Sequence, residues 1–119
     1  APQARISVMT TDGVTVVAVT GVIDMLTAPD VHVAVRDVLA GEPAAVLIDL
    51  TGVEFLASAG LEVLVNAHRL AGSGTRLAVV ADGPATSRPI QITGVDDYVP
   101  LFATANAAMA ALIGGPPSA

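Results

Sequence analysis

Two short runs of β-branched and apolar residues open the chain. They cover residues 6–11 and 14–20, and only Asp12 and Gly13 lie between them. An Asp-Gly pair between two β-prone runs is typical of a tight hairpin. We therefore expect residues 6–20 to form two antiparallel strands.

The first helical pattern begins near residue 27. Thr27 offers a hydroxyl cap, Pro29 suits an early helical position, and Asp30 places an acid near the positive end of the helix dipole. Apolar residues then recur at steps of three and four, at Val31, Val35, Val38 and Leu39. The Gly-Glu-Pro sequence at 41–43 follows, so we expect the helix to end near residue 39.

Two continuous apolar runs, residues 45–48 and 77–80, predict strands that are buried on both faces. The first run ends at Asp49, and we expect a short loop containing Phe55 and Leu56 to lead from it to Ser58. Helical spacing then continues to residue 71, with Leu61, Leu64, Val65 and His68 on one face. Strand, helix and strand in this order predict parallel pairing through a right-handed crossover.

The remaining pattern is weaker. A helical stretch at residues 85–92 is interrupted by Pro89, a short strand follows at 99–102, and a last helix covers 105–113. We predict an α/β fold with a mixed sheet of four to five strands. The 119 residues have room for one domain, which we place at 1–113, and the glycine- and proline-rich residues 114–119 predict a disordered tail.

Composition excludes several function classes. The chain has no cysteine, which removes disulfides, thiolate catalysis and most structural zinc sites. Five arginines, no lysine and eleven acids give a net charge of −6, which repels a nucleic acid backbone. No apolar run approaches the roughly 20 residues of a membrane span, and residues 1–5 lack a secretory signal pattern. We expect a cytoplasmic protein that binds neither nucleic acid nor membrane.

Candidate catalytic and ligand sites all lack a required part. Asp49 resembles a phospho-acceptor, but such sites also need an acidic pair after the first strand and a lysine, so we expect its carboxylate to serve the following turn. Gly72-Ser73-Gly74 follows a helix and lacks the third glycine of a dinucleotide site. His32 and His68 stand alone in the sequence, so we expect neither a metal nor a cofactor.

Ser58 is the one nucleophile in a suggestive position. It lies between a strand and a helix, but Leu56 replaces the first glycine of a nucleophile elbow. His68 lies ten residues along the same helix, about 15 Å away, and therefore cannot serve as its base. We do not expect an enzyme.

A helix start also suits a different role for Ser58. The free backbone N–H groups and the positive dipole end would receive a phosphate well. The ordinary interpretation is an N-cap serine, and the two roles are compatible. A phosphate would add about −1.5 to −2 charge at a place that its own helix tolerates, so its effect would fall on a partner docked there.

Two segments resemble a known family. Residues 21–24 (Gly-Val-Ile-Asp) and 49–61 (Asp-Leu-Thr-Gly-Val-Glu-Phe-Leu-Ala-Ser-Ala-Gly-Leu) are similar to the STAS-domain anti-anti-sigma factors, the antagonists of bacterial anti-sigma factor kinases. The resemblance covers nearly the whole chain. It implies helices packed mainly on one face of the sheet, no cofactor, and no catalysis by the domain itself.

The resemblance also implies a switch at Ser58. The dephosphorylated protein would bind an anti-sigma factor of the serine-kinase type and free a sigma factor. Phosphorylation of Ser58 by that kinase would release the partner, and a serine phosphatase would reset the switch. The family's aspartate near the end of the second strand falls on Asp24, and Ala57 stands where an aspartate is common.

We expect the partner to cover the start of the Ser58 helix and the loop after Asp24. Ala57, Ala59 and Gly60 are small and would allow close approach. The full predicted surface comprises Asp24 and Glu62 for charge, Met25, Leu26 and Leu56 for exposed apolar contact, and Ala57, Ser58, Ala59 and Gly60. The alternative is a small-ligand-binding or sensor module of the same superfamily, without phosphorylation.

Overall fold

The N-terminal hairpin is the one that the Asp-Gly pair predicts. The structure, a computed structural model, describes residues 3–114 and begins with β1 (Ala4–Thr11) and β2 (Val14–Ile23), which pair antiparallel. Asp12 and Gly13 have φ angles of 52° and 78°. Two positive φ angles form a type I′ turn, whose twist matches that of the flanking strands.

The five strands form one sheet in the order β1-β2-β3-β4-β5. β3 (Ala45–Leu56), β4 (Arg76–Val80) and β5 (Leu101–Phe102) each run parallel to the preceding strand in this order. The structure confirms the mixed α/β sheet and the parallel pairing of the two apolar runs. The strand expected at 99–102 is shorter, at Leu101–Phe102.

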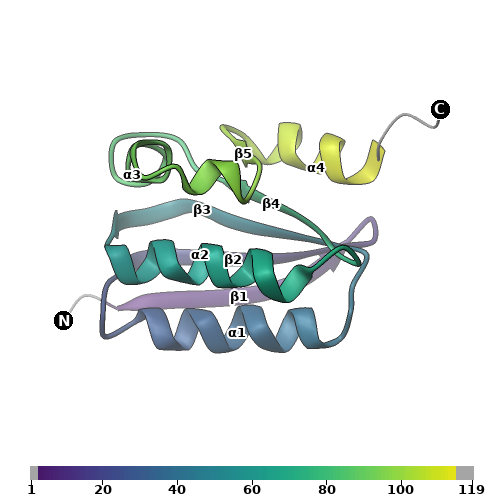
Figure 1. The fold of residues 1–119 in the computed structure, drawn as a ribbon, viewed down its shortest axis with the longest axis horizontal. Helices are drawn as coiled ribbons and strands as arrows, with labels where there is room; N and C mark the ends of the chain where they lie inside the picture. Colours follow the sequence, from purple (N-terminus) through teal and green to yellow (C-terminus); the bar gives the residue numbers. More distant parts are fainter. Residues whose placement is uncertain (1–2, 115–119) are drawn as a thin grey trace.

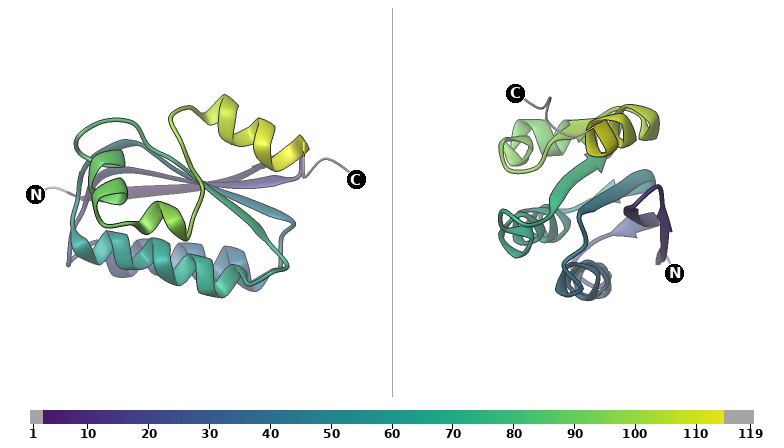
Figure 2. Two further views of the ribbon diagram at one scale, coloured as in Figure 1. Left: turned by 45° about the horizontal axis from the view of Figure 1, so that its top comes forward. Right: turned by 90° about the vertical axis from the view of Figure 1, so that its right-hand side faces the viewer.

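Helices cover both faces of the sheet, with most of them on one (Figure 1). We call the face covered by α1 (Ala28–Ala40), α2 (Ser58–Ala71) and α3 (Ser87–Ile92) the front face. The 3₁₀ turn η1 (Val95–Asp97) belongs to this side as well. α4 (Ala105–Gly114) lies alone on the back face (Figure 2). The expectation of helices mainly on one face is confirmed.

The two faces support separate hydrophobic cores. The front core is the larger and takes Val17, Ile48 and Val79 from successive strands together with the buried sides of α1, α2 and α3. The back core takes Leu47 and Val80 from the opposite side of the same strands and adds Ala108 and Leu112 of α4. This alternation along β3 and β4 is why both runs are continuously apolar.

β3 is much longer than expected. The predicted loop after Asp49 is wrong, because the strand continues to Leu56 and pairs with the end of β2. Two register shifts, between Ala18 and Thr20 and between Gly21 and Val22, make this pairing possible. The Asp49 carboxylate accepts a hydrogen bond of 2.9 Å from the Thr51 N–H, the local role expected for it, but inside a strand.

The C-terminal third differs in its boundaries, in the role of Pro89 and in the 3₁₀ turn η1, which the sequence did not predict. Pro89 lies in the first turn of α3, where a missing N–H costs nothing, so it does not interrupt that helix. α4 includes Gly114, the first residue of the predicted tail, and residues 115–119 lie outside the described part. Within residues 3–114, no helix has both the length and the apolar character needed to span a bilayer.

Candidate functional site

Ser58 is the first residue of α2 and its side chain is exposed. The N-cap position belongs to Ala57, whose backbone is extended (φ −81°, ψ 172°), and no side chain caps this helix among the described residues. The ordinary interpretation of Ser58 as an N-cap is therefore wrong. Its hydroxyl stays available at the surface instead of serving its own backbone.

The backbone around Ser58 is held by hydrogen bonds from both sides. The Ala57 N–H donates to the Ile23 carbonyl over 2.9 Å, which ties the start of α2 to the end of β2. The Ala57 carbonyl accepts from the N–H groups of Gly60 (2.9 Å) and Leu61 (3.2 Å). The first N–H groups of a helix lack partners within the preceding turn, and the helix dipole favours negative charge at this end.

The loop from Asp24 to Thr27 is shaped by its own side chains. The Asp24 carboxylate accepts from the N–H groups of Leu26 (2.9 Å) and Thr27 (3.0 Å). The Thr27 hydroxyl accepts from the Asp24 N–H (2.9 Å) and donates to the Val22 carbonyl (2.7 Å). Thr27 is the N-cap residue of α1, but its hydroxyl does not cap that helix, so the predicted hydroxyl cap is wrong.

These bonds also favour the ionised form of Asp24. The Thr27 N–H lowers the pKa of Asp24 most, partial desolvation opposes it, and the Leu26 N–H and the Thr27 hydroxyl add to the lowering. The carboxylate is thus held ionised and turned into its own loop. The loop in turn presents Met25 and Leu26 to solvent, with 77% and 83% of their surfaces exposed.

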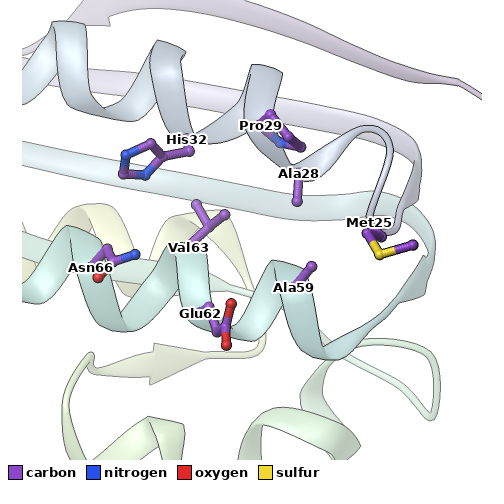
Figure 3. A pocket seen from close by; sticks show the side chains of 8 residues that line it. All are labelled: Met25, Ala28, Pro29, His32, Ala59, Glu62, Val63 and Asn66. Carbon is purple, nitrogen blue, oxygen red and sulfur yellow. The ribbon is translucent and has the colours of Figure 1, made fainter.

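A shallow groove runs between α1 and α2 beside this loop (Figure 3). It has a volume of about 300 Å³ and is lined by Met25, Ala28, Pro29, His32, Ala59, Glu62, Val63 and Asn66. Met25 of the loop and Ala59 of the first α2 turn line its same end, so the two predicted segments meet there. The sequence did not indicate His32 and Asn66 as neighbours of the site, because the packing of α1 against α2 brings them together.

Two residues predicted for the partner surface lie in the core instead. Leu56 is only 5% exposed, so its expected exposure is wrong. Gly60 is buried as well. A Cβ added at Gly60 would lie 2.8 Å from Ile23 Cγ2 and closer still to Leu56 Cδ1. The close approach that Gly60 allows is used by the protein's own helix and sheet.

Phe55 shows the opposite error. Its side chain is 54% exposed, although it was not predicted to belong to the surface. β3 pairs Val22 with Phe55 but Gly21 with Val53, so Glu54 is the extra residue that reverses the alternation. No local pattern could have shown this, because the irregularity arises only from pairing with β2.

The structure offers little for other chemistry. The His68 ring packs edge-on against Tyr98, with 5.6 Å between ring centroids. In the described range 3–114, no three residues of the types His, Cys, Asp and Glu come together as metal ligands. The site therefore has an exposed hydroxyl, exposed apolar side chains and a helix N-terminus, a combination suited to protein binding.

Known proteins share both the sequence and the fold. The family model for the STAS domain matches residues 5–108. The anti-sigma-F factor antagonist RsfB of Mycobacterium tuberculosis is 39% identical over 104 residues, 87% of this chain and 85% of RsfB.

Two solved structures extend the similarity. An anti-sigma factor antagonist from Mycobacterium paratuberculosis is 46% identical and has a TM-score of 0.89, with 92% of this chain and 93% of that chain covered. The antagonist SpoIIAA in its unphosphorylated form is 15% identical with a TM-score of 0.75, covering 94% and 99%, and shows the same fold.

Proposed function

The chain belongs to the STAS domain family, and from this premise we propose that it is an anti-sigma factor antagonist that phosphorylation of Ser58 switches off. It binds an anti-sigma factor of the serine-kinase type and thereby frees a sigma factor. The observation that carries the proposal is that Ser58 is exposed at the start of α2, beside the Asp24 loop, and that its hydroxyl does not cap this helix. The 39% identity to a protein named as an anti-sigma-F factor antagonist supports the class of partner.

The proposed partner surface combines the Asp24 loop with the first turns of α2. It comprises Asp24, Met25, Leu26, Ala57, Ser58, Ala59 and Glu62. Met25 and Leu26 offer the exposed apolar contact that interface centres use. Ala57 and Ala59 are half-buried, and their small side chains let a partner approach Ser58 closely. The exposed Glu62 offers charge complementarity. A standard interface would cover about 800 Å² on each partner.

Phosphorylation would act on this surface without unfolding the domain. The phosphate would lie at the N-terminus of α2, where its charge is favourable. A docked partner, however, would enclose that dianion, and desolvating an unpaired buried charge costs several kcal/mol. A loss of that size lowers affinity by orders of magnitude. We propose that the anti-sigma factor is itself the kinase and that a serine phosphatase restores binding.

Calorimetry with paired Ser58 variants tests the switch. The probe is the anti-sigma-F factor of Mycobacterium tuberculosis, the protein that RsfB is named for antagonising. We expect Ser58→Ala to bind as the unmodified protein does and Ser58→Glu to bind at least tenfold more weakly. Ser73→Glu, an exposed serine in the turn beyond the other end of α2, is the control and should bind normally. Equal affinities for the two Ser58 variants would disprove the switch.

A small-ligand module is the weaker alternative. The groove between α1 and α2 has about 300 Å³, the lower limit for ligand pockets, which are typically about 300–1,000 Å³. It is also open to solvent, and Met25, which lines it, is largely exposed. These features favour contact with a protein surface over enclosure of a small molecule.

A further inference from the structure

β1 is an edge strand whose only charged residue, Arg5, lies near its start. It forms one end of the strand order, so within residues 3–114 its outer side pairs with no other strand. Natural edge strands are shortened or carry proline, lysine or a bulge, because a free edge invites pairing with another chain. β1 has eight residues, no proline, no lysine and an unbroken register with β2. Val8 and Met9 at its centre are 51% and 61% exposed.

The hairpin turn determines which backbone groups of β1 remain free. In a two-residue type I′ hairpin the closing pair, here Thr11 and Val14, exchanges both backbone hydrogen bonds. Alternate residues counted back from Thr11 also bond β2. The N–H and C=O groups of Ile6, Val8 and Thr10 therefore point away from β2, along the open edge.

We propose that this edge is a homodimer interface, in which β1 pairs antiparallel with β1 of a second copy. A two-fold axis at Val8 places Val8 opposite its own equivalent and Ile6 opposite Thr10 of the second copy. All three residues are β-branched and suit cross-strand pairing. The sheets of the two copies then join into one continuous sheet.

Self-complementarity and topology both favour a second copy as the occupant. The same register pairs β1 with itself and places Arg5, the only charged residue of this strand, opposite the neutral Thr11 of the second copy, so no like charges meet. The far edge of the sheet, β5, has only two residues. A head-to-tail contact between β1 and β5 is therefore too short to hold an open chain of copies, and the closed two-fold pair remains.

The dimer is independent of the proposed function. The two-fold axis passes through the middle of β1, whereas Ser58 follows the far end of β3, two strands away. Both Ser58 surfaces stay open in the pair. Failure of the dimer would leave the antagonist role untouched, and the reverse also holds.

Sedimentation of the full chain over a micromolar to millimolar series tests the interface. We expect the weight-average mass to rise to twice the chain mass. Val8→Pro removes an outward N–H without removing a bond to β2, as proline on an edge strand permits, and should stay monomeric. Val8→Thr keeps the N–H and the β-branch and should dimerise as the unmodified chain does. A monomer at all concentrations, or a Val8→Pro variant that dimerises normally, would overturn the proposal.

Amide hydrogen exchange in the unmodified chain tests the same interface if Val8→Pro fails to fold. In the unmodified chain, exchange at the Ile6, Val8 and Thr10 amides should slow as concentration rises. The Ser7 and Met9 amides, bonded to β2, should not change. Slowing at neither set, or equally at both, would contradict pairing through this edge, and a species larger than a dimer would contradict the two-fold geometry.

Discussion

Gly60 shows how one buried residue fixes the position of the helix turn that carries Ser58. It lies in the first turn of α2, directly against Ile23 and Leu56, and any larger side chain there meets both. The same turn carries Ser58 on its outer side. The exposure of the hydroxyl and the burial of Gly60 are therefore two consequences of one close packing of helix on sheet.

We predict that Gly60→Ala destabilises the fold. Overpacking against Ile23 and Leu56 should lower the free energy of unfolding by about 1–3 kcal/mol, despite the better helix propensity of alanine. Gly74→Ala is the matched control, because its added Cβ meets nothing within 4 Å, and it should change stability little. Urea unfolding of both variants provides the measurement. A neutral Gly60→Ala would mean that α2 does not pack this closely.

The Asp24 loop shows the same dependence on neighbours at residue scale. Asp24 and Thr27 satisfy each other's backbone and leave Met25 and Leu26 exposed. From the sequence, Thr27 was expected to cap α1. The competing acceptor, the Val22 carbonyl, becomes available only when the loop turns back on itself.

At the scale of the element, the start of α2 favours a negative charge at residue 58. Its N-cap is Ala57, which supplies no side-chain acceptor for the first turn. Neither Ser58, Ala59 nor Gly60 is acidic, so no side chain of the first turn compensates the positive end of the dipole. In the unmodified protein, the start of α2 therefore keeps a partial positive charge that a negative group at residue 58 could offset.

A negative side chain at residue 58 should stabilise this helix. We predict that Ser58→Asp raises the free energy of unfolding by about 0.3–1 kcal/mol relative to the neutral Ser58→Asn. Residue 58 is exposed, so the difference should shrink as salt screens the charge. Urea unfolding at low and high salt measures both. If Ser58→Asp were the less stable of the two, weakened binding could not be separated from damage to the fold.

At the scale of the whole molecule, the sheet lies between the proposed partner surface and the hydrophobic core under α4. The proposed partner surface lies on the front side and α4 covers the back core. α4 is held there by Ala108 and Leu112 and by Arg76, whose guanidinium donates to the Leu112 carbonyl over 2.6 Å. Loss of packing on the back should not alter the front surface while the chain stays folded.

Leu112→Ala tests this separation. Leu112 is 6% exposed, and its truncation should cost about 2–4 kcal/mol of unfolding free energy. The affinity of the folded fraction for the anti-sigma factor should stay unchanged. Ile113→Ala in the same helix, at a side chain 53% exposed, is the control and should cost far less. A large affinity loss in Leu112→Ala would show that the two faces are coupled.

Local patterns in the sequence were enough for the order of the strands and α-helices, but not for the 3₁₀ turn η1. The Asp-Gly turn, the apolar runs at 45–48 and 77–80, and the start of a helix at Ser58 each depend on a few neighbouring residues. These features follow from turn chemistry and hydrophobic periodicity, which act over short stretches of chain. The sequence by itself therefore determined the α/β order and the position of Ser58 at a helix start.

Tertiary structure decided what faces solvent around that serine. The length of β3, the burial of Leu56 and Gly60, and the exposure of Phe55 all follow from the shifted register between β2 and β3. The groove beside Ser58 likewise needs α1 packed against α2. These outcomes depend on segments some 30 residues apart in the chain, and only their pairing and packing determine which side of each residue meets water.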